Sequence, residues 1–318
     1  MWNKRLKEIN QENSLQTAIR LWAIDYSSSK LISEEINIVY RFDTPQRSLF
    51  LRISPYSEQI FNNISNSLEL QSYLFNNKVH VAQPILSLTG SYIEKIYQER
   101  GTYILHLIEG VPGSKRNFSY IEPEYYKHWG KSLAQLHKEL QNVTSNKKSY
   151  FKSWQDSWKE IETYIEKESN DVKEKYKEID SWLNFHHFNI ESLGLIHGDH
   201  QCQNVFYDGT DTYFIDFDEV TYHWYGLDII MPFLELFGSP FKDWEYKLKA
   251  FLEGYQLLLP INIQSLYYLA NMKSLEIYLN CKNKWTLPTG PRGETKNQWI
   301  DSLHQMAINP LLPKNLAI

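Results

Sequence analysis

Residues 193–220, LGLIHGDHQCQNVFYDGTDTYFIDFDEV, gather two histidines, a cysteine, an asparagine and six acidic residues between runs of strand-forming residues. Two short runs rich in β-branched and aromatic residues, at 205–207 and 212–217, flank the pair Asp208-Gly209. Asp-Gly between two such runs is typical of a hairpin turn. The stretch therefore predicts a polar loop followed by a β-hairpin.

Three oxygen-bearing side chains of this stretch are predicted to converge. Asn204 enters the hairpin and Asp216 leaves it, and Asp199 lies on a compact loop five residues before Asn204. Phosphoryl transfer needs such a set, because one carboxylate orients the attacking hydroxyl and accepts its proton. An amide oxygen and a second carboxylate are hard ligands that hold Mg²⁺ against the nucleotide phosphates. The protein-kinase catalytic loop has the same five-residue spacing between its base and its metal-binding Asn.

The segment HGDHQCQNVFYDGTDTYFIDFDEV resembles the catalytic signature of the aminoglycoside phosphotransferase/choline kinase superfamily, nearest its homoserine kinase and bacterial stress-response kinase branches. The resemblance implies an α+β, bilobal protein-kinase-like fold with a small β-rich N-lobe and a larger, mainly helical C-lobe. It also implies an ATP- and Mg²⁺-dependent phosphotransferase with an alcohol group as acceptor. By the match, Asp199 is the catalytic base, and Asn204 and Asp216 hold Mg²⁺. Asp218, two residues further on, supports the metal or the substrate.

The resemblance covers most of the chain. The segment GKSLAQLH, residues 130–137, matches a family helix that ends in a histidine and packs under the active site. Asp228, in WYGLDII, matches an aspartate that braces the catalytic loop. The segment LIEGVPG, residues 107–113, matches the link between the lobes, where backbone groups of Glu109 and Val111 are expected to meet the adenine edge.

Two departures from the family pattern concern the nucleotide phosphates. Where protein kinases place a lysine on the third strand, LFLRIS places Arg52, on the opposite face from its apolar neighbours. An arginine can hold phosphate oxygens with two donors, so we predict that Arg52 contacts phosphate and that Glu69 is its helix partner. Residues 31–40, LISEEINIVY, contain no glycine for a phosphate-cradling loop. Ser33 and Asn37 are predicted to do part of that work.

A Gly/Pro break at residues 109–117, EGVPGSKRN, separates a β-rich front from a helical back. We therefore predict an N-terminal nucleotide-binding lobe at residues 1–109. The C-terminal catalytic and substrate lobe is predicted at residues 110–318.

The pattern of apolar residues predicts the elements of both parts. Residues 1–30 are expected to be helical, and five strands are expected at residues 36–40, 49–53, 84–88, 91–97 and 102–108. Further helices are expected at residues 60–76, 123–140, 154–187 and over most of 227–279.

The bulk composition excludes some classes of protein. The net charge of −5 and pI of 6.1 argue against a general nucleic-acid binder. No apolar run approaches the roughly 20 residues that cross a bilayer, and the polar N-terminal residues show no secretory signal. We therefore expect a cytoplasmic protein without a membrane or nucleic-acid partner. Its two cysteines form no disulfide framework.

The acceptor is predicted from the residues that follow the motif, DFDEVTYHWY. Acidic groups beside aromatic faces suit a cationic amine, so Glu219, Tyr222 and Trp224 are the predicted substrate residues, with further lining from the helix around residues 268–285. The predicted substrate is a small hydroxylated molecule, an amino alcohol or an aminoglycoside-like compound. The alternatives are a protein Ser/Thr kinase of the stress-response type and a nucleotide-binding pseudokinase.

HGDH also raises a metal hydrolase, with His197, Asp199 and His200 as ligands and His186-His187 as a second cluster. Such sites draw their ligands from several strand ends, whereas the second cluster lies in a helical pattern. We therefore expect His197 to brace the loop through a hydrogen bond and His200 to form part of a cleft wall.

Overall fold

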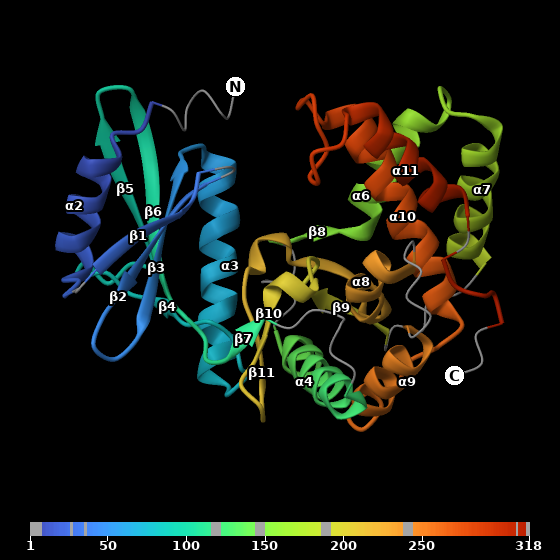
Figure 1. The fold of residues 1–318 in the computed structure, drawn as a ribbon, viewed down its shortest axis with the longest axis horizontal. Coiled ribbons are helices and arrows are strands. Elements are labelled where there is room, and N and C mark those ends of the chain that lie inside the picture. The colour runs from blue at the N-terminus through green and yellow to red at the C-terminus, as the bar shows by residue number, and fades with distance from the viewer. Residues whose placement is uncertain are drawn as a thin grey trace. The chain divides into compact units, whose positions relative to one another are not determined.

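The computed structural model describes residues 8–25, 28–34, 37–115, 122–143, 150–185, 192–237, 244–309 and 311–315. The chain divides into two compact units (Figure 1). One consists of Met1–Lys115 with Val205–Asp218, and the other of Arg116–Asn204 with Glu219–Ile318. The hairpin thus belongs to the same unit as the N-terminal residues, although it lies far beyond residue 109 in the sequence. The assignment of nucleotide and substrate roles to the two parts stays a prediction.

The first unit is built on a six-stranded antiparallel sheet. Its strands follow the order β1-β2-β3-β6-β4, and β5 also pairs with β6. They are β1 (Ser28–Ser33), β2 (Ile38–Asp43), β3 (Ser48–Pro55), β4 (Pro84–Ile85), β5 (Ile93–Gln98) and β6 (Gly101–Glu109).

The prediction that residues 1–30 are helical is wrong at its C-terminal end. Helix α2 (Gln11–Trp22) ends where Ala23 adopts a φ of 47°, and the chain then enters β1. The polar edge strand β1 exposes its only large apolar residues, Leu31 and Ile32, so it lacks the one-sided apolar alternation that marks a strand in a sequence.

The strand predicted at residues 84–88 is shorter than expected. The Ser87 hydroxyl donates to Glu94 Oε1 at 2.5 Å and accepts from the Thr89 backbone N–H at 3.2 Å. This local side-chain bonding favours a turn over a continued strand.

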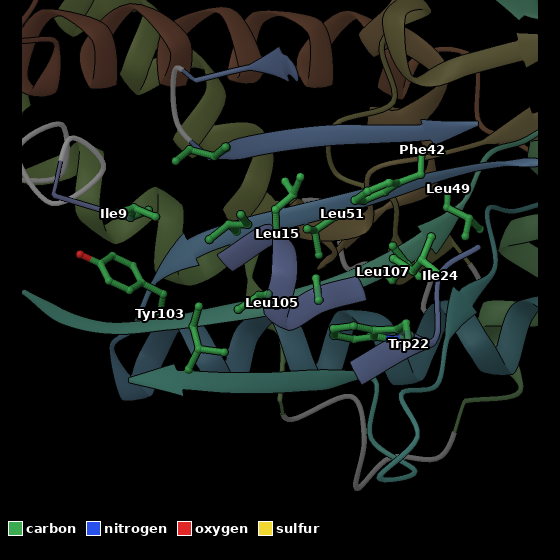
Figure 2. Close-up of a cluster of buried hydrophobic side chains, with 14 residues drawn as sticks. Ile9, Leu15, Trp22, Ile24, Phe42, Leu49, Leu51, Tyr103, Leu105 and Leu107 are labelled. Carbon is green, nitrogen blue, oxygen red and sulfur yellow. The ribbon is translucent and has the colours of Figure 1, made fainter. Parts of the chain in front are cut away.

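Two helices cover opposite faces of this sheet because the side chains of β6 alternate. Tyr103, Leu105 and Leu107 join a buried cluster with Leu15 and Trp22 of α2, as Figure 2 shows. Ile104 and Ile108 instead pack with Ile64 and Leu68 of α3 (Glu58–Asn76). The predicted helix at residues 60–76 is thereby confirmed.

Arg52 lies on the α3 side of the sheet. It alternates along β3 with Leu51 and Ile53, both of the α2-side cluster, and it pairs with His106 on β6. The predicted facing of Arg52, opposite its apolar neighbours, is confirmed.

The hairpin predicted from Asp208-Gly209 is present in the first unit. β10 (Val205–Tyr207) pairs with β11 (Thr212–Phe214), and β7 (Ser114–Lys115) pairs with β10 on its other side. The Asp208 carboxylate closes the turn by accepting from the backbone N–H groups of Thr210 and Asp211, each at 2.8 Å.

The second unit is largely helical, as predicted for the C-terminal part. A small sheet orders β8 (Lys152–Ser153), β12 (Thr221–Trp224) and β9 (Leu193–Ile196). The helices are α4 (Pro123–Gln141), α6 (Trp154–Ile165), α7 (Asn170–Phe185), α8 (Tyr225–Phe237), α9 (Trp244–Tyr255), α10 (Ser265–Lys284) and α11 (Lys296–Ile308).

The amphipathic pattern at residues 154–187 is not one helix, because α6 and α7 are separated by residues 166–169. Glu168 in this break is buried and accepts from Lys282 Nζ of α10 at 2.7 Å. A tertiary ion pair of this kind has no signature in local periodicity.

Helices α4 and α9 cross closely at two glycines. A Cβ on Gly130 would lie 1.9 Å from the Phe251 carbonyl oxygen, and one on Gly254 would lie 1.9 Å from that of Lys127. Both distances are far below van der Waals contact, so the crossing requires glycine on each helix.

Candidate active site

The loop between β9 and β10 holds the predicted base in a fixed orientation. Asn204 Nδ2 donates to Asp199 Oδ2 and to the Asp199 carbonyl oxygen, both at 2.8 Å. Gln201 Nε2 donates to Asp199 Oδ1 at 2.6 Å. Because Nδ2 is the donor end of the buried Asn204 amide, its acceptor oxygen Oδ1 points away from Asp199. That orientation fits the predicted role of Asn204 as an oxygen ligand.

Gly198 allows the loop to turn directly before Asp199. Its φ is +81°, and a Cβ at this position would lie 1.9 Å from the Glu219 carbonyl oxygen. Only glycine fits both the backbone conformation and the space, which explains the glycine of the HGD motif.

Asp228 braces this loop from α8, as predicted. Its Oδ2 accepts from the His197 backbone N–H at 2.7 Å and its Oδ1 from that of Gly198 at 3.0 Å. His137 Nε2 lies 3.0 Å from Oδ2, and both side chains are fully buried. Burial alone would raise the pKa of the Asp228 carboxyl, but the His137 hydrogen bond and the electrostatic effects of His137, His200 and His197 together outweigh it and hold the pKa well below its ordinary value.

His137 is a neutral donor in this network. Burial lowers its pKa more than the Asp228 carboxylate raises it. Burial also raises the pKa of Tyr255 well above its ordinary value, so its hydroxyl donates to His137 Nδ1 at 2.8 Å. The proton of His137 is then on Nε2 and faces Asp228. This confirms the prediction that the helix at residues 130–137 packs under the loop.

His200 was expected on a cleft wall, and that expectation is wrong. The side chain is fully buried, accepts from Trp129 Nε1 at 2.9 Å, and donates from Nδ1 to the Asp228 carbonyl oxygen at 2.7 Å. Burial lowers its pKa to about 4. Both ring nitrogens are used, so His200 is not a metal ligand, which also argues against the metal-hydrolase alternative. The other histidine pair of that alternative, His186-His187, lies outside the described residues.

The predicted metal aspartates follow the hairpin in the first unit. Asp216 adopts a φ of 67° without being glycine, a conformation with an energetic cost that is common at functional sites. Phe217 anchors the next position, because its ring is buried and its carbonyl oxygen accepts from Ser67 Oγ of α3 at 2.7 Å. Asp216 and Asp218, on either side of this anchor, both remain partly exposed.

Arg52 contacts both of these aspartates. Its Nη1 lies 3.3 Å from Asp216 Oδ1, and its Nη2 lies 2.6 Å from Asp218 Oδ2. The structure therefore joins Arg52 to the predicted metal carboxylates within the same unit. The predicted pairing of Arg52 with Glu69, an exposed residue of α3, stays a prediction.

The other predicted nucleotide residues have structural partners of their own. The Asn37 side-chain oxygen accepts from Ser54 Oγ at 2.6 Å, which ties the start of β2 to β3. Ser33 ends β1 at an irregularity in its pairing with β2. Glu109 forms an ion pair with Arg47, and its backbone N–H donates to the Gln83 carbonyl oxygen at 2.8 Å. Val111, two residues further on, is half-buried.

The three predicted substrate residues differ in exposure. Glu219 is exposed and Tyr222 is half-buried, whereas Trp224 is only 4% exposed. The Trp224 ring packs 4.7 Å from that of Trp154 and 5.7 Å from that of Trp182, between centroids. Packing in the core thus accounts for Trp224, and the substrate roles of all three stay predictions.

Sequence reasoning did not find Ser67, Trp129 or Tyr255. Each supports the site through one hydrogen bond, to Phe217, His200 and His137 respectively. Trp129 and Tyr255 occupy apolar positions of helices, and Ser67 has no distinguishing neighbour in the sequence. No signal in a single sequence separates such residues from ordinary core positions.

Comparison with known proteins decides the family. Residues 29–256 match the phosphotransferase enzyme family. The chain belongs to this family. Its members transfer phosphate to hydroxyl groups and use ATP with a divalent metal ion. This chain is therefore an ATP-dependent phosphotransferase with an alcohol acceptor.

Curated and solved relatives agree with that placement. The chain is 19% identical over 264 residues to amicoumacin kinase of Bacillus subtilis (strain 168), which covers 80% of this chain and 79% of that protein. A solved amicoumacin kinase in complex with AMP-PNP, Ca²⁺ and Ami matches 98% of both chains with a TM-score of 0.81 and 20% identity. A microcompartment-associated aminopropanol kinase matches 93% of this chain and 95% of its own, with a TM-score of 0.64 and 15% identity. The predicted kinase-like α+β fold of this phosphotransferase is confirmed.

The two residues predicted to hold Mg²⁺ carry donors of the type that this ion prefers. Asn204 offers an amide oxygen and Asp216 a carboxylate, the hard oxygen ligands that magnesium prefers. Within the described residues, no group of three or more His, Cys, Asp or Glu side chains could hold a metal ion. None of the described helices has the length and apolar character needed to span a membrane.

Proposed function

We propose that this phosphotransferase transfers the γ-phosphate of ATP to a hydroxyl of a small molecule that also carries an amine, such as an amino alcohol or an aminoglycoside-like compound. The observation that supports the chemistry best is the Asp199 carboxylate, oriented by Asn204 and Gln201. The relatives act on, or bind, amicoumacin and aminopropanol according to their names. A spectinomycin phosphotransferase bound to ADP and spectinomycin also matches 94% of this chain and 95% of its own, with a TM-score of 0.64 and 14% identity.

In this proposal Asp199 orients the acceptor hydroxyl and takes its proton, and Arg52 contacts the nucleotide phosphates. Asn204 and Asp216 would hold Mg²⁺, which neutralises charge on the transferred phosphoryl group. Asp228 does not touch the reactants. It fixes the backbone N–H groups of His197 and Gly198, and with them the position of the base.

The proposal is tested by incubating the purified chain with ATP and Mg²⁺ and a panel of hydroxyl compounds. The panel contains 1-amino-2-propanol, homoserine, choline, spectinomycin and amicoumacin, and ADP release and phosphorylated product are measured together. Product from one or more of these amines supports the proposal. Autophosphorylation on serine or threonine without any small-molecule product would favour the protein-kinase alternative. An ATP- and Mg²⁺-dependent thermal shift without any phosphorylation would favour the pseudokinase.

Asp199→Asn tests the role of the base. Asparagine keeps the shape of the side chain but cannot accept the proton, so kcat should fall by roughly 10²–10⁴-fold. AMP-PNP binding in the presence of Mg²⁺, measured by calorimetry, should change little. Gln201→Ala is a matched control, because it removes one donor to Asp199 and leaves the carboxylate. Full turnover by Asp199→Asn would show that another group acts as the base.

A further inference from the structure

One face of α10 carries three polar side chains, two of which have a buried oxygen without a partner among the described residues. Lys273, Glu276 and Asn280 follow each other at helical spacings of three and four residues, which places them on one face. Glu276 is only 6% exposed, and Lys273 Nζ lies 3.6 Å from its Oε2. Among the described residues, neither Glu276 Oε1 nor Asn280 Oδ1 has a hydrogen-bond partner, although both atoms are buried.

His223 of β12, the strand whose Trp224 packs against α10, carries another buried polar atom. The Trp224 backbone N–H donates to His223 Nδ1 at 2.9 Å, so the neutral ring carries its proton on Nε2. Nε2 is buried and has no partner among the described residues. Burial, and next the charge of Lys273, lower the pKa of His223 to about 3, which keeps the ring neutral.

β12 connects this face to the catalytic loop. Thr221 pairs with Ile196 at the end of β9, directly before the HGD segment, and His223 pairs with Gly194 two residues along the same ladder. Successive strand residues are about 3.3 Å apart. Through its pairing with Gly194, His223 therefore lies only a few residue spacings from the loop that carries Asp199. Trp224 belongs to the same buried cluster as Leu269 and Met272 of α10, which places the helix against the strand.

Another buried carboxylate of this unit shows what a purely structural pair looks like. Glu168, 7% exposed, accepts from Lys282 Nζ at 2.8 and 2.7 Å through its two oxygens, and from the Tyr278 hydroxyl at 2.9 Å. Glu276 is equally buried, but within the described part of the chain its one ion pair is the longer contact with Lys273. Burial accordingly raises the pKa of the Glu276 carboxyl more than Lys273 lowers it. Buried polar atoms without partners are costly and uncommon in native proteins.

We propose that His223, Glu276 and Asn280 form the acceptor subsite, which binds a substrate ammonium group through the oxygens of Glu276 and Asn280 and a neighbouring substrate oxygen through His223 Nε2–H. The proposal rests on the proposed function and narrows it to compounds that carry an amine close to a hydroxyl or carbonyl oxygen. Lys273 holds the second oxygen of Glu276. An ammonium group there completes the bonding of both orphaned acceptors.

Glu276→Gln tests this subsite, with Glu168→Gln as its matched control. Both variants remove one negative charge from an equally buried carboxylate in the same unit, but Glu168 already has its partners. The probes are 1-amino-2-propanol, spectinomycin and amicoumacin, each compared with its N-acetylated form. Binding is measured as a thermal shift with AMP-PNP and Mg²⁺ present, and KM and kcat are measured for every probe that is phosphorylated.

We expect at least one free amine, and not its N-acetylated form, to shift the melting temperature of the wild type. Glu276→Gln should weaken that binding, and raise KM, by about 10- to 100-fold, the usual effect of losing a hydrogen bond to a charged group. Glu168→Gln should bind as the wild type does. Asn280→Ala, a smaller change at a half-buried position, should weaken binding in the same direction and guards against a folding defect in Glu276→Gln.

Turnover of an amine with an unchanged KM in both Glu276→Gln and Asn280→Ala would overturn the subsite and leave the proposed function intact. A lower melting temperature of Glu276→Gln without weaker binding would likewise show a structural role only. Equal binding of free and acetylated amines would overturn the ammonium assignment. If the wild type neither binds nor phosphorylates any probe, the proposed function fails, and the subsite fails with it.

Discussion

Asp228 and Asp216 are both aspartates of the active-site motifs, but their surroundings are opposite. Asp228 is fully buried and accepts from two backbone N–H groups and from neutral His137. The Asp216 side chain is 42% exposed, adopts a left-handed backbone conformation and pairs with a charged group, Arg52. The first carboxylate is bound by donors that cannot leave without unfolding the loop. The second is bound by a flexible side chain that a cation can replace.

The comparison distinguishes a carboxylate that fixes the position of a loop, Asp228, from one that is proposed to bind a metal ion, Asp216. A buried charge is tolerated when every oxygen is hydrogen-bonded, and such a network fixes the loop at one position. A partly exposed carboxylate costs little to release from its partner. The loop that carries the proposed base, Asp199, is therefore rigid, whereas the carboxylates proposed to bind the metal can change partner during a catalytic cycle.

Asp228→Asn should have the largest effect on stability. The amide would place an N–H group against donors of His197, Gly198 or His137, and lost hydrogen bonds to a buried charge cost about 1.5–3 kcal/mol each. The free energy of unfolding should fall by about 3 kcal/mol or more, measured by urea unfolding with tryptophan fluorescence.

Asp208→Asn is the matched control for that experiment. Asp208 also accepts several hydrogen bonds, from Thr210, Asp211 and Tyr213, but it is exposed in the hairpin turn. Its replacement should cost clearly less than that of Asp228. Equal losses of unfolding free energy in the two variants would mean that the burial of Asp228 contributes nothing to stability.

The sequence pointed to both the proposed metal ligand, Asp216, and the bracing residue, Asp228. Asp199, Asn204 and Asp216 lie in one short motif whose spacing reflects a loop and a hairpin, whereas Asp228 was identified through the resemblance to the family. The catalytic and metal-binding roles of the first three stay predictions. Two of the sheet strands have clear apolar patterns that were also sufficient to find them. They are β3, with a one-sided pattern, and β6, with a continuous buried run.

What the sequence could not show depends on contacts between distant residues. The burial of His200 depends on Trp129, which is 71 residues away, and the ion pair of Arg52 with Asp216 spans 164 residues. The break at Glu168 depends on Lys282, 114 residues away. A hydrogen bond formed over such separations leaves no periodic trace, since each partner alone is an ordinary polar or core residue.

The neutral histidines of the brace should make the protein sensitive to acid. The pKa of His200 is about 4 in the folded chain, against about 6.5 when unfolded. A lowered folded pKa means that the unfolded state binds more protons below pH 6.5, so the stabilisation is complete above that pH and is lost as the pH falls toward 4. Between pH 7 and pH 5 this histidine alone should cost about 2 kcal/mol of unfolding free energy.

Urea unfolding of the wild type and of His200→Gln at pH 7 and pH 5 checks this prediction. Since the variant lacks the titrating group, its stability relative to the wild type should improve by about 2 kcal/mol on acidification. Buried His106 and His223, each with a pKa of about 3, remain in both proteins and shift both in the same direction. A constant difference between the two proteins would show that His200 is protonated equally in the folded and unfolded chains.

Arg52→Met should have the smallest effect of these substitutions. It should strengthen the binding of Mg²⁺ alone and weaken the binding of AMP-PNP with Mg²⁺. Arg52 neutralises Asp216 and Asp218 in this structure, so Mg²⁺ must displace or share it. An ion pair this exposed contributes at most about 1 kcal/mol, so Mg²⁺ alone should bind the variant about three- to fivefold more tightly. AMP-PNP with Mg²⁺ should bind more weakly, because the phosphates lose their guanidinium contact. Isothermal titration calorimetry measures both affinities.

Two further variants determine whether Arg52 is a competitor of the metal as well as a contact of the phosphates. Arg52→Lys keeps the charge but loses the two-pronged geometry, so its Mg²⁺ affinity should stay near that of the wild type while AMP-PNP binding weakens. Asp216→Ala should lose Mg²⁺ affinity and metal-dependent nucleotide binding together, because it removes the ligand itself. Weaker binding of Mg²⁺ alone to Arg52→Met would mean that the arginine organises the two aspartates for the metal. Both carboxylate sites would then depend on a fixed partner, and the contrast between Asp216 and Asp228 would disappear.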